Sequence, residues 1–276
     1  MLNRIKTRLL GFWLLHLAPR SRQRLLAHWT QGGTDLEGRE REHFDALSAA
    51  VDRSYYAART STRRREQLKH LCMGASSGVR WAEKYSARGF PDDLTPHIGM
   101  FGFIETALRD RKVSTVHQVA CCSGREVAYY AQRYPDLEFV GSDVDPEIVD
   151  WLRKHWVHLP NLRFEVLALE LTAQRSWNVV DADLVIASGG LHYMDTASLH
   201  NFCAQVRTRA RYLTLSQPCN VHYAVSSAVE SGPRVQLSWS HPYCHILQEH
   251  GWSLTEQVEF VPEPTLNAKN FSCWAE

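Results

Sequence analysis

From residue 113 to the C-terminus, short apolar runs alternate with segments whose apolar residues recur at helical spacing. The runs predict five strands and the segments between them predict three helices. The strands are expected at 115–120, 137–142, 162–167, 183–188 and 211–216, and the helices at 125–134, 146–156 and 196–207. This alternation predicts an α/β fold with a mostly parallel sheet that helices cover on both faces.

The end of the chain departs from this alternation. Residues 243–250 predict a further helix that ends at Gly251, and residues 252–261 and 270–275 predict two closing strands. Because a short turn containing proline joins these two strands, we expect an antiparallel C-terminal hairpin at the edge of the sheet.

The first 112 residues have helical periodicity and little strand character. Apolar residues recur at helical spacing between Leu36 and Tyr55, for example. We therefore divide the chain into a basic amphipathic segment over 1–30, a helical region over 31–112 and an α/β domain over 113–276.

Composition narrows the class of protein. The chain has 276 residues, which exceeds the usual domain length of about 100–150 and favours one domain with an elaboration. Its net charge is +1, so the whole chain lacks the charge signature of a nucleic-acid-binding protein. Its 7 cysteines lack the spacing of a small disulfide-linked domain, which indicates reduced thiols and a cytoplasmic location. No apolar run reaches the roughly 18 residues that a membrane span requires.

Residues 1–30 depart from this neutral balance. They contain six arginine or lysine residues and no acid, and the short apolar run 9–18 lies between the basic residues. A basic helix of this kind suits shallow insertion into an anionic membrane surface, so we expect peripheral contact with the inner face of the membrane. The alternative is that the same apolar residues cap the core of the α/β domain.

The most informative stretch is 116–144, where a tight turn joins an apolar run to a helix and a second apolar run ends at Asp143. This pattern puts a helix N-terminus and a carboxylate at neighbouring strand ends, where an adenosine-type cofactor can lie. Asp143 follows Gly124 by nineteen residues, close to the interval of about 20 expected for a ribose-binding carboxylate.

The turn Ser123-Gly124-Arg125-Glu126 resembles motif I of the class I S-adenosylmethionine-dependent methyltransferases. Residues 141–147 resemble the second strand end of that family, and residues 183–193 resemble its fourth-strand motif. The resemblance covers the chain from about residue 113 onward. It implies a Rossmann-like sheet, S-adenosylmethionine as the cofactor and an N-terminal helical cap or lid over the substrate. Residues 236–243 distantly resemble methyltransferases of surface-polysaccharide clusters, which favours a small-molecule or glycan-like hydroxyl acceptor.

Motif I departs from the family pattern at three positions. Aligned on Gly124, the usual acid falls on Gln118, and two usual glycines fall on Ala120 and Cys122. Gln118 can form hydrogen bonds but cannot pair electrostatically with the ammonium group of the cofactor. These departures leave open a non-catalytic Rossmann-like subunit that supports a partner enzyme. A nicotinamide-dependent oxidoreductase is disfavoured because the glycine triplet for a pyrophosphate is missing.

The resemblance implies a cofactor site at the strand ends. Asp143 is expected to accept hydrogen bonds from both ribose hydroxyls, whereas Asp145 is better placed to cap the following helix. An acid near the adenine amino group falls on residue 169 or 170. The expected cofactor-binding residues are Gln118, Ala120, Cys122, Ser123, Gly124, Asp143, Val144, Leu169, Glu170 and Ser188.

A hydroxyl acceptor usually requires a base near neutral pKa. His192, just beyond the fourth strand, is the leading candidate, with Tyr193 beside it, and His241 is a weaker candidate. Cys219, His222, His241 and Cys244 have the composition of a zinc site, but the strand and helix patterns around the cysteines disfavour one, so no metal is expected. The acceptor atom and the oligomeric state stay open.

Overall fold

The structure is a computed structural model, and two compact units make up the chain. Residues 1–81 with 233–238 form the first unit, and residues 82–232 with 239–276 form the second. The sequence-based boundaries at 30/31 and 112/113 differ from this division and stay a prediction. The structure describes residues 2–28, 36–58, 65, 67–68, 71–72, 78–87, 98–110, 113–167, 181–220, 229–233, 237–260 and 268–276. Leu169, Glu170 and His222 therefore lie outside the described residues.

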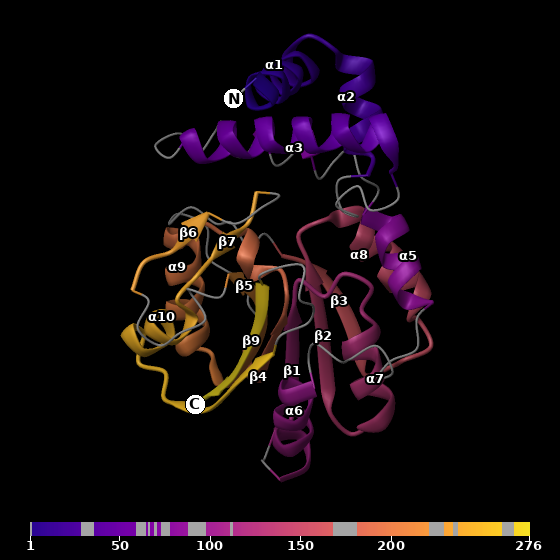
Figure 1. Cartoon of the computed structure of the whole chain (residues 1–276). Helices are drawn as coiled ribbons and strands as arrows, with labels where there is room; N and C mark the ends of the chain where they lie inside the picture. Colours follow the sequence, from indigo (N-terminus) through magenta and orange to yellow (C-terminus); the bar gives the residue numbers. More distant parts are fainter. Residues whose placement is uncertain are drawn as a thin grey trace. The chain divides into compact units, whose positions relative to one another are not determined.

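The first unit is helical (Figure 1). It contains α1 (Leu2–His16), α2 (Pro19–Leu26) and α3 (Gly38–Ala57). Helix α1 lies so close to α3 that a Cβ at Gly11 would meet the backbone oxygen of Ala46 at 2.3 Å. The buried side chains that join the three helices are mostly aliphatic and aromatic: Leu14, Leu15, Leu25, Leu26, Phe44, Leu47, Val51 and Tyr55. Among the described helices, none has the length and apolarity of a membrane span.

The second unit is an α/β domain. Its strands are β1 (Thr115–Val119), β2 (Glu138–Asp143), β3 (Leu162–Val166), β4 (Ala182–Ser188), β5 (Ala210–Asn220), β6 (Gly232–Pro233), β7 (Trp239–Ser240), β8 (Leu254–Phe260) and β9 (Ala268–Ala275), β6 reaching into the first unit at Pro233. Its helices are α5 (Gly78–Ser86), which begins in the first unit, α6 (Ile98–Asp110), α7 (Arg125–Arg133), α8 (Pro146–His155), the 3-10 helix η3 (Leu191–Tyr193), α9 (Thr196–Arg207) and α10 (Tyr243–Glu249).

Seven strands form one sheet in the order β3-β2-β1-β4-β5-β9-β8. The first five are parallel, and β9 pairs antiparallel with both β5 and β8 (Figure 1). The prediction of a mostly parallel sheet with an antiparallel C-terminal hairpin is confirmed. The last strand of the chain lies inside the sheet, and β8 forms the edge.

Both faces of the sheet are covered, as the alternation of strands and helices predicts. On one face, buried residues of α6, α7 and α8 pack against β1, β2, β3 and β4. On the other, buried residues of α9 and α10 pack against β4 and β5. The strands are therefore apolar on both sides, which is typical of a parallel sheet.

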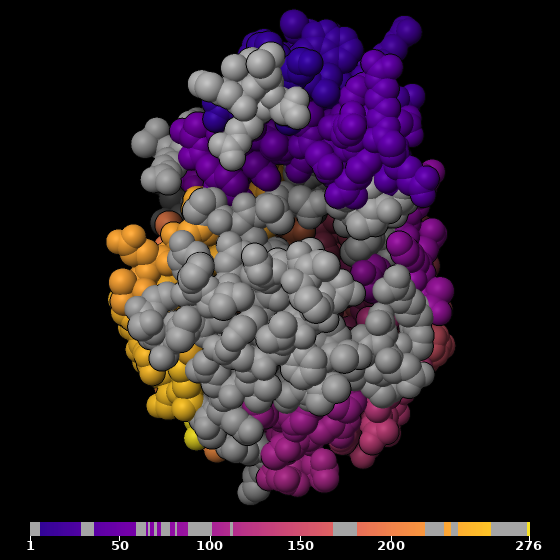
Figure 2. All heavy atoms as spheres, viewed as in Figure 1, coloured from indigo at the N-terminus to yellow at the C-terminus, as the bar shows by residue number. Residues whose placement is uncertain are grey.

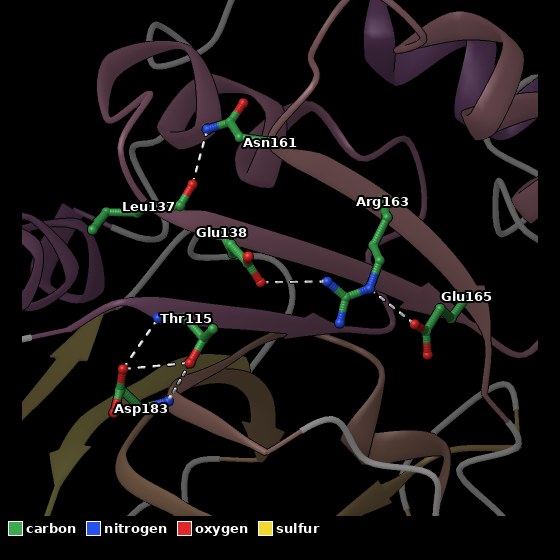
Figure 3. Close-up of polar contacts among 7 residues, drawn as sticks. All are labelled: Thr115, Leu137, Glu138, Asn161, Arg163, Glu165 and Asp183. Atoms are coloured by element: carbon green, nitrogen blue, oxygen red, sulfur yellow. Dashed lines mark hydrogen bonds and ion pairs between the residues drawn. The ribbon is translucent and has the colours of Figure 1, made fainter.

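Polar contacts fix the register at the N-terminal ends of the parallel strands (Figure 3). Asp183 Oδ2 accepts hydrogen bonds from Ser114 N and Oγ, both at 2.7 Å, and from Thr115 N at 3.1 Å. Arg163 on β3 donates to Glu165 and pairs with Glu138 on β2. The contacts of Asp183 with Ser114 and Thr115 lie at the opposite ends of the strands from the predicted cofactor site, so they serve the fold, whereas Glu165 is the next-to-last residue of β3.

Candidate functional site

The strand order reverses between β1 and β4, because the chain runs outward to β2 and β3 on one side and to β5 on the other. In open α/β sheets, ligands bind beyond the C-terminal ends of the strands at such a reversal. The turn after β1, the end of β2 and the loop after β4 therefore surround the candidate site.

The turn after β1 has an unusual backbone. Ala120, Cys122 and Gly124 have φ angles of 53°, 51° and 66°, so all three lie in the left-handed region. Glycine occupies this region at no steric cost, whereas other residues there store about 1–3 kcal/mol of strain each. At Ala120 and Cys122, where the family pattern has glycine, the backbone thus keeps a conformation that glycine favours. Both strained residues lie at the candidate site.

Hydrogen bonds and close packing hold this turn in place. Cys121 N donates to Ser142 O at 2.9 Å, and Trp156 Nε1 donates to Ser123 O at 3.0 Å. A Cβ at Gly124 would lie 2.8 Å from Leu152 Cδ2, so glycine is required there both for its φ angle and for this approach. The buried Ser123 is part of the turn's scaffold.

Asp143 lies at the end of β2 and faces the turn. Its Oδ2 accepts from Cys122 N at 3.0 Å, and its Oδ1 accepts from Asp145 N at 3.2 Å. Burial raises the pKa of Asp143, and these backbone donors act in the opposite direction. The backbone N–H of Val144 also bonds to the carboxylate, which keeps lone-pair capacity for a ribose hydroxyl because it can accept about four hydrogen bonds. The neighbouring Val144 is 52% exposed and offers an apolar surface beside the carboxylate.

Asp145 has the capping role that the sequence predicts. Its side chain accepts from Glu147 N at 2.9 Å at the start of α8. Asp143 and Asp145 therefore divide two tasks, one at the candidate site and one at a helix N-terminus.

Gln118 is buried and points to the N-terminus of α7. Its Oε1 accepts from Val127 N at 3.1 Å, and its Nε2 donates to Glu126 Oε2 at 2.5 Å. Glu126 also has a side-chain hydrogen bond with Ser188 at the end of β4. An amide, a carboxylate and a hydroxyl thus connect β1, α7 and β4 at the point where the strand order reverses.

The sequence analysis did not identify Glu126 as a site residue. The signal was present, because Glu126 precedes Tyr130 by one helical turn and therefore lies on the face of α7 that the apolar pattern buries. An acid on a buried helix face beside a strand end is a candidate for ligand binding.

The loop after β4 contributes two further residues with positive φ angles. Gly189 and Gly190 have φ angles of 81° and 85°. A Cβ at Gly190 would lie 2.3 Å from the Cβ of Ala120. The methyl group of Ala120 therefore occupies the space in front of Gly190, which couples the altered motif to the fourth-strand loop.

His192 lies on η3, directly after this loop, and is buried. Its Nδ1 is 3.4 Å from Gln217 Oε1. Gln217 Nε2 donates to the backbone oxygens of Ala187 and Gly189, which turns its Oε1 toward the imidazole. Because Oε1 can only accept, the proton of a neutral His192 lies on Nδ1 and the lone pair on Nε2. Tyr193 stacks beside His192 with ring centroids 4.1 Å apart.

His241 lies close to η3 but has a different environment. Its Nε2 is 3.1 Å from Met194 O, and its Nδ1 is 2.8 Å from Ser231 Oγ. The carbonyl requires a proton on Nε2, so Nδ1 accepts from the serine. Burial lowers the pKa of His241 to about 4. Both ring nitrogens hold neighbouring segments together, so the geometry favours His192 over His241 as a base. Within the described part of the chain, no three potential metal ligands gather at one place.

The described residues fit S-adenosylmethionine. The left-handed turn presents backbone to a ligand, Asp143 keeps lone pairs for ribose hydroxyls, and Glu126 brings a carboxylate to the end of β1. Among the predicted cofactor residues, the structure brings Gln118, Ala120, Cys122, Ser123, Gly124, Asp143, Val144 and Ser188 to the ends of β1, β2 and β4.

Comparison with known proteins agrees with this arrangement. Residues 116–211, about a third of the chain, match a family model described as a methyltransferase domain. No curated protein sequence matches the chain. Similar solved structures include the N-methyltransferase NodS from Bradyrhizobium japonicum WM9 with S-adenosyl-L-homocysteine, at 12% identity and a TM-score of 0.48, covering 73% of this chain and 99% of that one. Another is a SAM-dependent methyltransferase from Aquifex aeolicus, at 16% identity and a TM-score of 0.49, covering 71% and 96%.

These two likenesses are too weak to carry an argument about individual residues, so the identification depends on the match of residues 116–211 and on the sheet order around it. Residues 116–211 are therefore similar to a methyltransferase domain, and the strands of the second unit have the order of a Rossmann-like α/β sheet.

Proposed function

We propose that the domain transfers the methyl group of S-adenosylmethionine to a hydroxyl group of a small-molecule or glycan-like acceptor, with His192 as the general base. The observation that supports this most is the orientation of His192. Gln217 holds the imidazole by Nδ1 at the end of β4, so the nitrogen with the lone pair is Nε2.

The cofactor supplies an electrophilic methyl group on a sulfonium. With the cofactor and the acceptor bound, the acceptor hydroxyl would lose its proton to His192 Nε2, while the cofactor would supply the methyl group and leave as a neutral thioether. Gln217 Oε1 accepts a hydrogen bond from Nδ1 throughout and stabilises the imidazolium that results. Tyr193 packs on the ring and limits its rotation.

His192→Ala tests this role. If His192 is the base, turnover should fall by roughly 10² to 10⁴ while the affinity for S-adenosylhomocysteine stays nearly unchanged. The dependence of turnover on pH should also lose its acidic limb. Near-normal turnover with the true acceptor would contradict the assignment, and His241→Ala with the same loss would favour the other histidine.

We also propose that the first unit contacts the inner, anionic face of a membrane through α1. Leu9, Phe12 and Trp13 lie on one face of this helix and Leu17 follows its last residue, and the four are between 46% and 66% exposed, although the opposite face of α1 is buried on α3. Figure 2 shows the indigo N-terminal helices at the surface. Three exposed apolar residues on a basic helix and a fourth just after it support insertion at an interface.

The charges around this stripe fit an anionic headgroup. Lys6, Arg8 and Arg20 are exposed on and just after α1, and the chain has no acid before Asp35. A groove of about 500 Å³ between α1 and α3 is lined by residues that include Arg8, Phe12, His16 and Arg53. A headgroup phosphate would meet guanidinium groups there while its acyl chain meets the stripe.

Cosedimentation with vesicles tests the membrane contact. Phosphatidylglycerol vesicles should retain the protein, whereas phosphatidylcholine vesicles should not, and about 0.5 M salt should weaken the retention. Phe12→Ser/Trp13→Ser should abolish it, while Val157→Ser, which removes an exposed apolar residue from the second unit, should have no effect. Equal retention of both variants would contradict this proposal.

A further inference from the structure

The carboxylate of Glu126 is the feature of the site that the family pattern does not explain. Motif I of the related methyltransferases has an acid at the position of Gln118, and this chain has an amide there. The structure returns a carboxylate to the same place from α7, since Gln118 Nε2 donates to Glu126 Oε2. We propose that Glu126 supplies the negative charge that binds the ammonium group of S-adenosylmethionine. This inference depends on the cofactor assignment within the proposed function.

The position of Glu126 favours a ligand at the reversal of the strand order. The carboxylate contacts Gln118 of β1 and Ser188, the last residue of β4. The contact between Gln118 Oε1 and Val127 N fixes the amide, so its Nε2 must face the acid. Glu126 is also in the first turn of α7, where the partial positive charge of a helix N-terminus favours a carboxylate.

The charge of Glu126 lacks an ion-pair partner of matching strength in these contacts. Its hydrogen-bond partners are an amide and a hydroxyl, and only 8% of the residue is exposed. The neighbouring Arg125 donates to Tyr85 O at 3.4 Å, and its guanidinium lies 5.3 Å from the centre of the Tyr85 ring. A buried carboxylate is costly without a cation, and the ammonium group of a ligand would remove that cost.

The raised pKa of Glu126 is consistent with binding of an ammonium group. Burial raises the pKa of Glu126 to about 7, and the contacts with Ser188, Gln118 and Arg125 act in the opposite direction. Among the residues that the structure describes, Cys121 and Tyr130 also interact electrostatically with Glu126, and burial raises the pKa of both, so they stay neutral. An ammonium ligand should therefore complete the ionisation of Glu126, and binding near pH 7 should release a fraction of a proton.

Two ligands that differ at the amino acid end test the proposal by calorimetry. S-adenosylhomocysteine carries the ammonium group, and 5′-methylthioadenosine lacks the whole amino acid portion. In Glu126→Gln, the affinity for S-adenosylhomocysteine should fall at least tenfold, while the affinity for 5′-methylthioadenosine stays within about twofold. The proton release measured in two buffers of different ionisation enthalpy should also disappear.

The controls separate this role from a structural one. Glu105→Gln neutralises another largely buried acid of the second unit, on α6, and should leave both affinities unchanged. If Glu126→Gln does not fold, the exchange Gln118→Glu/Glu126→Gln keeps one acid and one amide in the pair and should retain the preference for S-adenosylhomocysteine.

The outcomes are distinguishable. If both affinities fall together in Glu126→Gln, or neither falls, the role of Glu126 is overturned while the cofactor assignment stands. Loss of the preference in the exchange variant would also overturn it. If the unmodified protein binds neither ligand, the cofactor assignment itself fails.

Discussion

At the scale of single residues, the site combines strained backbone with buried polar groups. Ala120 and Cys122 have glycine-like φ angles without being glycine, and the buried Gln118 donates a hydrogen bond to the buried Glu126. Strain and buried charge of this kind persist where the surroundings enforce them, and both are typical of functional sites.

The contact between Ala120 and Gly190 can be measured with a double-mutant cycle. Gly190→Ala introduces a methyl group 2.3 Å from Ala120 Cβ at a φ angle of 85°, so we expect a loss of more than about 2 kcal/mol of stability in urea unfolding. Adding Ala120→Gly should recover the steric part, which appears as a coupling energy of at least about 0.5 kcal/mol.

Gly189→Ala is the matched control for this cycle. Gly189 has a φ angle of 81°, but a Cβ there would meet nothing within 4 Å. This variant should show the conformational strain alone, and Ala120→Gly should not rescue it. Equal rescue of both variants would mean that the methyl group of Ala120 is not what requires glycine at residue 190.

Asp143→Asn tests ribose recognition. The amino end of the amide cannot accept, so in either orientation it loses the bond from Cys122 N or from Asp145 N, and it can no longer accept from a ribose hydroxyl at that end. Each lost bond to a charged group costs about 1.5–3 kcal/mol, so the affinity for S-adenosylhomocysteine should fall at least tenfold by calorimetry.

The control for Asp143 is its neighbour in the same loop. Asp145→Asn should preserve the cap of α8, because asparagine caps helices as well as aspartate, and should leave the affinity unchanged. Unchanged affinity in a folded Asp143→Asn variant would remove Asp143 from the cofactor site.

At the scale of elements, the two ends of the parallel strands have separate roles. The C-terminal ends of the strands hold the site, and the N-terminal ends hold contacts that fix the register, such as those of Asp183 with Ser114 and with Thr115. Figure 3 draws the contact with Thr115. The stability of the sheet and the binding of the cofactor should therefore respond to different substitutions.

Asp183→Ala separates these tasks. The variant loses the acceptor that joins the starts of β1 and β4, and we expect about 1–3 kcal/mol of destabilisation in urea unfolding. Affinity for S-adenosylhomocysteine should not change at a temperature where the variant is folded. Glu165→Ala removes an exposed ion pair with Arg163 within β3. It should cost no more than about 0.5 kcal/mol of stability. If Asp183→Ala lost affinity for S-adenosylhomocysteine, the N-terminal and C-terminal ends of the strands would be coupled.

At the scale of the whole molecule, buried titratable groups set the dependence of stability on pH. Burial lowers the pKa of His117 and of His241 to about 4, below the value of about 6.5 in an unfolded chain. The unfolded state therefore binds more protons below pH 6.5, and stability is lost as the pH falls from 6.5 toward 4. Glu126 acts in the opposite direction, because its raised pKa favours the folded state at low pH and disfavours it as the pH rises through 7.

Variants isolate these opposing contributions. In Glu126→Gln, the stability of the protein should fall more steeply between pH 6.5 and 5 than in the unmodified protein, by about 1 kcal/mol per pH unit. His117→Gln should make the fall shallower by a similar amount. Urea unfolding at several pH values measures all three slopes. Identical slopes in Glu126→Gln and the unmodified protein would contradict the raised pKa of Glu126.

Local pattern and spacing determined much of this protein. The strands of the main sheet, helices α7 to α10, the C-terminal hairpin and the cap at Asp145 follow from periodicity and from residue types that act on their immediate neighbours, whereas the sequence did not predict β6, β7 or η3. Short-range forces fix these features, so the sequence alone reveals them.

Tertiary structure decided what depends on residues far apart in the chain. Only the fold brings the carboxylate of Glu126 to Gln118 and Ser188, sets the methyl group of Ala120 against Gly190 and gives His192 its tautomer through Gln217. Likewise, only packing shows that β9 lies inside the sheet and that one face of α1 stays exposed. Hydrogen bonding and burial depend on three-dimensional proximity, and pattern along the chain does not encode that proximity for single side chains.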